Sequence, residues 1–371
     1  MALCFRSMND LDTEPRESAR FVPGIDIDWL FVSSSLRISR WRCQAQSPEL
    51  SGDRCQPWHV LGFTHVGAFV MQTEGRSLVV DANTVMLHSP GIPYRTAHPF
   101  GGGDRGSSLV LRPGVLREMV ARYDPARVES APETFRFPAP HAICPPKGYL
   151  LQRLLFELLS RPNGADLMRI EETGLSLAES AIRECFRRVV PVKRQARAAT
   201  VRQHRECVEA AKGLLVERFR EPLRLDDLAL QLNVSSCHLA RLFKRETGLP
   251  IHRYLNRLRL RCALEGLPEC GRDLTSLAFD LGFSSHSHFS ASFGQEFGLT
   301  PSQVQQIAHS GHLPESFDRR GRAPQAPARW AGSARSMISA LSSALPAAAT
   351  GPRREATAAY LVSRVSQSAA I

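Results

Sequence analysis

The spacing of apolar side chains divides the chain into a strand-rich N-terminal part and a helical C-terminal part. Across 57–111, apolar and polar residues alternate in short runs separated by turn residues at Gly67, Gly75 and Pro90-Gly91. Alternation with a period of two predicts half-buried strands, because successive side chains of a strand point to opposite faces. Strands recurring at this spacing predict a small barrel or a sandwich.

The period changes to that of a helix after these strands. PGVLREMVARY at 113–123 predicts a helix with proline at its first position, and KGYLLQRLLFELLSRP at 147–162 carries a helical stripe of leucines. Residues 164–190 continue in helical phase. Two amphipathic helices of this kind either pack on the strands or pair with a second copy of the chain, and the sequence leaves both readings open.

Composition divides the remainder into a linker, a helical domain and a tail. PVKRQARAATVRQHR at 191–205 is polar and basic without an apolar stripe, so it predicts a linker. Residues 206–309 are densely helical in pattern. The N-terminal 1–24 predicts a flexible segment, and 310–371, rich in Ala, Ser, Pro and Arg, predicts a disordered tail.

The helical stretch contains an internal repeat. LDDLALQLNVSSCHLARLFKRETGLP at 225–250 is followed by LTSLAFDLGFSSHSHFSASFGQEFGLTP at 274–301. Each copy predicts a short helix, a tight turn and a longer helix that begins at paired serines and ends at Gly248 or Gly298. Two helices joined by so short a turn are typical of a helix-turn-helix unit. The Cys and His residues near the serines match no zinc-ligand spacing, so we predict no metal site there.

The second helix of the first copy has an outer face suited to the DNA major groove. Leu239, Leu242 and Phe243 form one stripe that must face the core. The remaining face contains the candidate DNA-binding residues: the basic side chains can bond guanine or phosphate, and the leading small ones can meet base edges. These residues are Ser236, Cys237, Ala240, Arg241, Lys244 and Arg245. The alternative is an ordinary solvated face.

The second copy keeps the core but loses the charge. Phe289 and Phe293 continue the buried stripe, while Ala291 and Gly294 stand where the first copy has Arg and Lys. Its candidate DNA contacts are therefore polar and uncharged, acting with backbone amides. They are His286, Ser287 and Ser290.

A third set of basic residues lies in PIHRYLNRLRLRCALEGL, between the two copies. Arg253, Arg257 and Arg261 recur every four residues and share one face of the predicted helix. They can contact phosphate or form a solvated face, and we favour phosphate, with Arg257 as the candidate.

These residues resemble the AraC/XylS family of bacterial transcription regulators. The resemblance rests on L-A-x-x-L-N-V-S-S-x-x-L-x-R-x-F-K-x-E-T-G at 228–248 and S-L-A-F-D-L-G-F-S-S-x-S-x-F-x-x-x-F-x-x-E-F-G-L-T-P-S at 276–302. It covers roughly 204–308 and implies a seven-helix domain with two helix-turn-helix units joined by a long helix. The second unit departs from the family pattern at Ala291 and Gly294, so we expect it to contribute less to DNA contacts.

The strands and helices of 25–190 look similar to the cupin-type sensor and dimerisation domain of such regulators. The fold class that follows is α+β, with a cupin-like β-barrel and dimerisation helices before an all-α domain. The resemblance implies a small effector in the barrel, and we take His65, His88, Tyr94 and Arg95 as its candidate anchors. The metal pattern of cupins, His-x-His with a downstream Glu and His, is absent. No cofactor, metal ligand or catalytic residue is therefore predicted.

Charge and cysteine content indicate the kind of partner and the cellular compartment to expect. The net charge of +11 indicates an anionic partner, although basic and acidic residues nearly balance within 200–309. Nine cysteines without a C-x-x-C pair predict reduced, mostly buried thiols. The N-terminus lacks a signal peptide and no apolar run is long enough to span a bilayer, which predicts a cytoplasmic protein.

The sequence therefore predicts a homodimeric, sequence-specific transcription regulator and not an enzyme. Its expected partners are double-stranded promoter DNA, a small effector and, if it activates, RNA polymerase, with no membrane partner. Two alternatives remain: a metal-dependent cupin-type enzyme, and a protein-interaction module that has lost DNA binding. The missing metal spacing and the lack of a nucleophile–base motif argue against the enzyme. The nearly neutral charge of 200–309 keeps the interaction module open.

Overall fold

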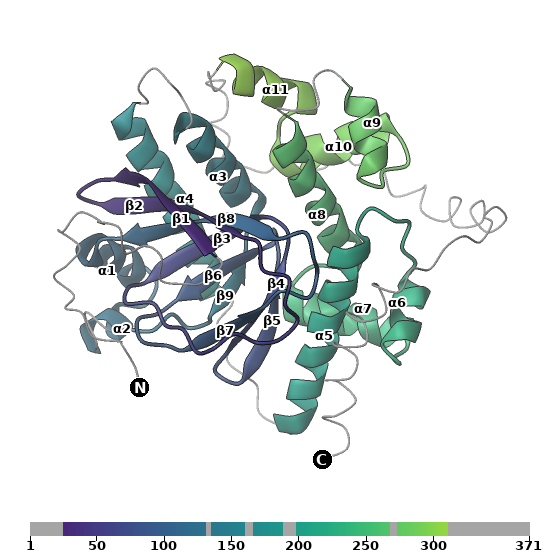
Figure 1. The fold of residues 1–371 in the computed structure, drawn as a ribbon, viewed down its shortest axis with the longest axis horizontal. Helices are drawn as coiled ribbons and strands as arrows, with labels where there is room; N and C mark the ends of the chain where they lie inside the picture. The colour runs from purple at the N-terminus through teal and green to yellow at the C-terminus, as the bar shows by residue number, and fades with distance from the viewer. Residues whose placement is uncertain (1–24, 131–134, 160–165, 188–197, 268–272, 311–371) are drawn as a thin grey trace.

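The structure, a computed structural model, describes residues 25–130, 135–159, 166–187, 198–267 and 273–310 (Figure 1). The N-terminal part contains the strands and four helices. The strands are β1 (Ile25–Val32), β2 (Leu36–Cys43), β3 (Val60–Val66), β4 (Phe69–Thr73), β5 (Arg76–Val80), β6 (Thr84–His88), β7 (Tyr94–Ala97), β8 (Asp104–Leu111) and β9 (His141–Ile143). The helices are α1 (Pro113–Ala121), α2 (Pro125–Ser130), α3 (Pro146–Leu159) and α4 (Leu167–Arg187).

The C-terminal part consists of helices, as the apolar spacing predicts. They are α5 (Ala198–Arg218), α6 (Leu225–Gln231), α7 (Ser236–Thr247), α8 (Ile251–Gly266), α9 (Leu274–Asp280), α10 (His286–Phe297) and α11 (Pro301–Ser310). Helix α8 joins the pair α6–α7 to the pair α9–α10 and packs against the sheet strand β3. The helical part therefore contacts the strands directly.

The strands form two antiparallel sheets that face each other. The larger has six strands in the order β1-β2-β8-β3-β6-β9, and the smaller has three in the order β5-β4-β7. Side chains of both sheets meet in one apolar cluster that contains Trp41, Phe69, Met71, Leu78, Val80 and Met86. Because alternate side chains point to opposite faces, each sheet has a second apolar face to cover.

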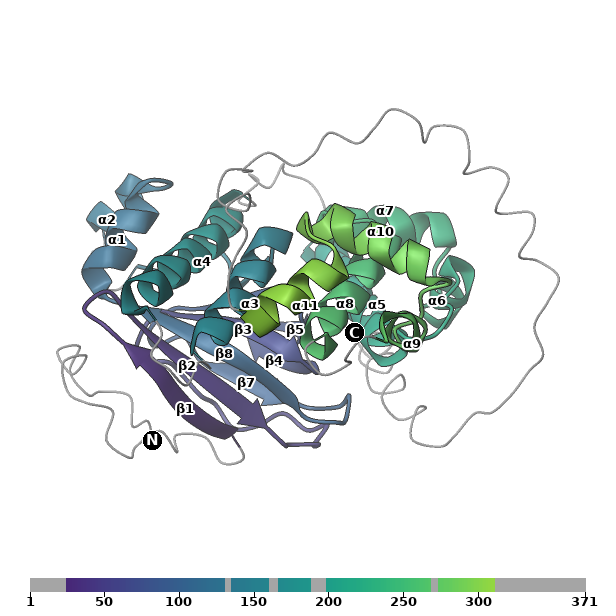
Figure 2. The same ribbon diagram turned by 90° about the horizontal axis from the view of Figure 1, so that it is seen from above.

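Helices cover those second faces. On the six-stranded sheet, Leu36, Ile38 and Leu109 belong to the same buried cluster as Leu155 of α3 and Ile182 of α4. Figure 2 shows α3 and α4 lying over this sheet. On the three-stranded sheet, Val70, Val79 and Ala97 pack with Val216 of α5. The amphipathic stripes predicted at 147–162 and 164–190 thus pack on the strands.

Helix α5 also covers the free edge of β5. The Val79 backbone N–H donates to Glu209 Oε2 at 2.6 Å, and Lys212 Nζ donates to the Val79 carbonyl at 2.6 Å. Glu209 and Lys212 are themselves paired at 2.9 Å. One acidic and one basic side chain thereby satisfy the edge groups that a further strand would otherwise bond.

Three expectations about the fold need correction. Among the described residues the strands pair as two separate sheets, so no closed barrel forms, and α5 occupies the β5 edge where closure would continue. Residues 198–205 are the first turns of α5 and not linker, while 191–197 lie outside the described residues. Cys55 is disulfide-bonded, so the prediction of reduced thiols is wrong there; six other cysteines within the described ranges are free.

The predicted flexible segment 1–24 and nearly all of the predicted tail 310–371 lie outside the described residues. Among the helices that the structure does describe, none combines the length and apolar character needed to cross a bilayer.

Candidate DNA-binding surface

The paired serines and glycines of the repeat begin and end the two longer helices, as predicted. Ser235 caps α7 by accepting a hydrogen bond from the His238 backbone N–H at 3.2 Å, and Ser285 caps α10 in the same way. Gly248 and Gly298 end these helices in the left-handed conformation, each with φ of 74°. Glycine reaches that conformation without the steric cost of a Cβ, so both copies stop the helix identically.

Helix α7 buries its apolar stripe and exposes the opposite face. Leu239, Leu242 and Phe243 are each no more than 2% exposed. Cys237, Arg241 and Lys244 are exposed, and their spacing of four and three residues aligns them along one side of the helix. We call Cys237, Arg241 and Lys244 the α7 face.

The other three candidates of the first copy border the α7 face. Ala240 is half-buried and Arg245 is exposed. Arg245 hydrogen-bonds Glu246 and His204 Nδ1, both at 3.0 Å, which holds its guanidinium beside α5. The Ser236 hydroxyl donates to the Asp226 carboxylate and so ties α7 to α6.

Helix α10 repeats the core without the charge. Phe289, Phe293 and Phe297 are buried. His286 and Ser287 are exposed and Ser290 is half-buried, with the Ser290 hydroxyl 3.4 Å from His286 Nε2. No Lys or Arg lies in α10, so the second copy presents hydroxyl and imidazole groups where the first presents cations. Helix α10 also contacts α3 of the N-terminal part.

The arginines of α8 do not form the phosphate-contacting row that their spacing predicts. Arg253 alone is exposed. Arg257 lies 2.6 Å from Glu296 of α10, and both side chains are at most 14% exposed. Arg261 is fully buried. Arg257 is thus paired and largely covered by the neighbouring helix, and its contact with DNA stays an untested prediction.

Arg261 reaches across to the strands. Its guanidinium donates to the Ala82 carbonyl and, at 2.5 Å, to the Cys144 carbonyl. The same group lies 4.8 Å from the centre of the Tyr149 ring. A buried cation needs hydrogen bonds to replace its hydration, and both acceptors come from the N-terminal part.

Tyr254, near the start of α8, also bonds the segment between β5 and β6. Its hydroxyl donates to Asp81 Oδ2 at 2.6 Å, and its backbone carbonyl accepts from Asn83 Nδ2 at 3.1 Å. Burial raises the pKa of the Tyr254 hydroxyl well above its ordinary value, so it stays a donor to Asp81. Segment 79–84 runs from the end of β5 through the connection to the start of β6. It is therefore bonded to both α5 and α8.

The four candidate effector anchors do not share one cavity. The His88 ring lies at a tilt of 49° to the Tyr94 ring, with ring centres 4.6 Å apart, and burial lowers the pKa of His88 to about 4. His65 lies elsewhere, bonded to Ser107 at 3.0 Å. Arg95 is exposed and paired with Asp53 at 2.6 Å, and it is not among the residues that line the pocket beside His88.

A small pocket does open beside His88. Its volume is about 30 Å³, enough for one or two water molecules. Met71, Thr73, Leu87, Ile92 and Phe137 are among its other lining residues. The pocket lies at the end of β6, whose other end enters segment 79–84, so one strand connects the pocket to the contacts with α8.

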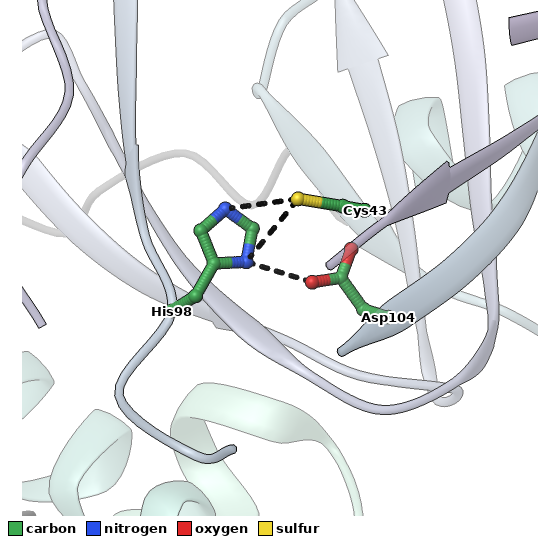
Figure 3. Close-up of side chains that lie close together, drawn as sticks. All are labelled: Cys43, His98 and Asp104. Atoms are coloured by element: carbon green, nitrogen blue, oxygen red, sulfur yellow. Dashed lines mark hydrogen bonds and ion pairs between the residues drawn. The ribbon is translucent and has the colours of Figure 1, made fainter. Parts of the chain in front are cut away.

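The structure also brings together a group that the sequence analysis missed. Cys43, His98 and Asp104 converge in the interior, with His98 Nδ1 2.7 Å from Asp104 Oδ2 and Cys43 Sγ 3.7 Å from His98 Nε2 (Figure 3). Burial lowers the pKa of His98, but the hydrogen bonds to Asp104 and Cys43 outweigh it and raise the pKa to about 9. Cys43 is 55 residues from His98, so no local pattern could have joined them.

Comparison with known proteins identifies the helical part. The family model described as a helix-turn-helix domain matches residues 228–307. The HTH-type transcriptional activator RhaS of Escherichia coli O157:H7 is 38% identical over 92 residues, which is 25% of this chain and 33% of RhaS. The chain thus spans a third of the length of the curated relatives that it matches.

Two solved structures are similar at low TM-scores. An AraC-type transcriptional regulator from Chromobacterium violaceum is 30% identical over 29% of this chain and 95% of its own, with a TM-score of 0.27. Fatty-acid-bound ToxT from Vibrio cholerae is 12% identical over 76% of this chain and 99% of its own, with a TM-score of 0.28. The assignment therefore rests on the sequence match: residues 228–307 match a helix-turn-helix domain, and this part of the chain is similar to the transcriptional activator RhaS.

Proposed function

We propose that this chain is a sequence-specific DNA-binding transcription regulator that contacts promoter DNA chiefly through the α7 face. The observation that carries the proposal is the exposed row Cys237, Arg241 and Lys244 on the longer helix of the first pair. A recognition helix enters the major groove with such a face, and its leading residues read base edges. Arg can bond guanine through two donors, which discriminates by about 1–3 kcal/mol.

The residues of α7 divide into two roles under this proposal. Cys237, Ala240 and Arg241 point toward the groove and supply specificity. Lys244 and Arg245 supply affinity, because a contact with phosphate is the same for every base sequence. In the structure Arg245 is held by His204 and Glu246, so it reaches phosphate only after it leaves them.

The pair α9–α10 acts as a second, weaker helix-turn-helix unit in this proposal. Its candidates His286, Ser287 and Ser290 carry no cation, so they add little Coulombic attraction to DNA. Helix α10 also packs beside α3, which restricts its approach to a groove. Ser287→Ala should therefore change DNA affinity by less than about 0.5 kcal/mol.

Regulation in this proposal passes through segment 79–84. A ligand can shift the protein only if it binds two arrangements with different affinity. Strand β6 joins the pocket beside His88 to the contacts of Asp81 and Ala82 with α8. An effector that widens this pocket would displace those contacts and change how α7 is presented.

The proposal also includes activation, which is suggested by a relative, and dimerisation, which is suggested by exposed apolar side chains. The relative RhaS is a transcriptional activator, and activation requires contact with RNA polymerase at the promoter. Leu167 and Met168, at the start of α4, are 67% and 71% exposed, and they offer apolar area to a second copy.

Selection of genomic DNA fragments by the purified full chain, followed by sequencing, tests the proposal. We expect a shared motif that contains at least one guanine in the segment protected by α7 in a footprint. Fragments without any common motif would contradict sequence-specific binding. A chain that retains no DNA at all at low salt would favour the protein-interaction alternative.

A further inference from the structure

Three chemically active side chains meet where three strand ends converge. Cys43 ends β2, Asp104 begins β8, and His98 directly follows β7. Figure 3 shows the Cys43 sulfur and the Asp104 carboxylate turned toward the His98 ring. Each of the three residues is at most 8% exposed, and each offers one ligand atom within 4.8 Å of the other two.

The backbone is shaped to bring these residues together. Cys43 and Asp104 are directly opposite each other in the β2–β8 ladder. The chain returns from His98 to Asp104 through Gly101, Gly102 and Gly103, all with φ between 68° and 78°. A Cβ on Gly103 would lie only 2.8 Å from the Cys43 carbonyl oxygen, so glycine is required where the loop passes β2.

One contact holds the His98 ring and another holds its backbone. Phe69 stacks on the His98 ring with centres 5.6 Å apart and an interplanar angle of 29°. The His98 backbone N–H donates to the Ser47 carbonyl at 2.7 Å. A fixed ring beside a thiol and a carboxylate is a preorganised set of donors, because little side-chain freedom remains to be lost on binding a ligand.

The spacing of the donor atoms approaches that of a tetrahedral ion. Zn²⁺ bonds Cys sulfur at about 2.3 Å and His nitrogen or carboxylate oxygen at about 2.0–2.2 Å, which places neighbouring ligand atoms roughly 3.2–3.6 Å apart. Cys43 Sγ lies 3.9 Å from His98 Nδ1, slightly beyond this range. Asp104 Oδ2 lies 2.7 Å from the same nitrogen, slightly below it. Each separation differs from this range by no more than about 0.5 Å.

We propose that Cys43 Sγ, His98 Nδ1 and Asp104 Oδ2 form a binding site for a Zn²⁺-class transition-metal ion, with water as the fourth ligand. The ion takes the place of the proton between His98 and Asp104. Binding releases that proton and the thiol proton of Cys43 to solvent, so the thiolate, the neutral imidazole and the carboxylate each donate one electron pair. Thiolate and imidazole favour zinc over magnesium or calcium, which prefer oxygen alone.

Such a site would join the two sheets of the N-terminal part. Cys43 and Asp104 belong to the six-stranded sheet, whereas His98 follows the last strand of the three-stranded sheet. An ion bound to all three fixes one end of the sandwich. The site is independent of the α7 face, so its test does not depend on DNA binding.

Titration of the chelator-treated full chain with Co²⁺ tests the site, since a Co²⁺–thiolate bond gives a near-ultraviolet charge-transfer absorption. We expect one Co²⁺ per chain with this absorption, displaced by Zn²⁺. Cys43→Ser and Asp104→Asn should each weaken binding by at least about tenfold. The controls Cys185→Ser, at another buried cysteine, and Cys237→Ser, at the exposed one, should bind like the unaltered chain.

Two results would overturn the proposal. One is an unaltered chain that takes up no Co²⁺ or Zn²⁺ in stoichiometric amount, which would leave the group as a buried ion pair. The other is Cys43→Ser binding as tightly as the unaltered chain while the Cys237→Ser variant loses the absorption. If Cys43→Ser fails to fold, the melting temperature of the unaltered chain decides: it should rise with Zn²⁺ and fall back with chelator.

Discussion

The arginines of α7 and those of α8 have the same spacing in the sequence and opposite surroundings in the structure. Arg241 and Arg245 are four residues apart and exposed, whereas Arg257 and Arg261, also four apart, are covered. A helical projection identifies the face opposite the apolar stripe. It does not show whether a second part of the molecule covers that face.

The difference assigns the two helices to different tasks. Helix α7 presents its cations outward, where they can meet phosphate and bases. Helix α8 turns Arg261 toward the carbonyls of Ala82 and Cys144 and Arg257 toward Glu296. These two charges hold α8 to the strands and to α10. Basic residues in a DNA-binding domain can therefore be structural, and only their partners distinguish the two roles.

Replacing Arg261 should give the largest effect on stability. Arg261→Met leaves two buried carbonyls without a donor, each at a cost of about 1–3 kcal/mol, so the free energy of unfolding should fall by about 2–5 kcal/mol. Urea unfolding followed by circular dichroism measures the change. Arg253→Met, on the exposed side of the same helix, is the control and should change stability by less than about 0.5 kcal/mol. Equal stability of the two variants would show that Arg261 is not structural.

The ion pair between Arg257 and Glu296 can be isolated by a double-mutant cycle. Arg257→Gln, Glu296→Gln and the double variant should give a coupling energy of about 0.5–3 kcal/mol in the free energy of unfolding. Both side chains are nearly buried, so solvent screens the pair only weakly. A zero coupling energy together with tighter DNA binding by Glu296→Gln would instead mean that Arg257 contacts a DNA phosphate.

Lys244 should affect DNA binding and leave the fold unchanged. Lys244→Ala removes one phosphate contact, so the slope of log K against log salt should become shallower by about 0.9. Affinity should fall alike for all base sequences. Lys147→Ala, at an exposed lysine of α3, is the matched control and should leave the slope unaltered. If both variants showed the same slope, Lys244 would lie outside the interface.

Local chemistry made the repeat predictable. Ser235 and Ser285 cap their helices and Gly248 and Gly298 end them, because each of these preferences depends on the backbone of one turn. The buried stripes of α7 and α10 follow from the same short-range periodicity. For the caps and buried stripes of these two helices, the local sequence contains the information needed.

Contacts between distant segments were not predictable in this way. AATVRQHR at 198–205 lacks an apolar stripe, yet it begins α5 because the helix continues into a buried segment. Whether the strands close into a barrel depends on which sheet edges α5 covers. Glu209 and Lys212 bond the edge of β5, and no pattern in the sequence around them indicates this. Cys43, His98 and Asp104 meet only because two sheets and a glycine loop position them.

The base preference of Arg241→Ala tests the central claim most directly. Binding of the unaltered chain and the variant is measured by competition against a set of operator variants, each with one base pair changed. The account predicts that Arg241→Ala loses about 1–3 kcal/mol of discrimination at a single position and keeps its stability. An unchanged preference at every position would contradict the assignment of the α7 face to base recognition.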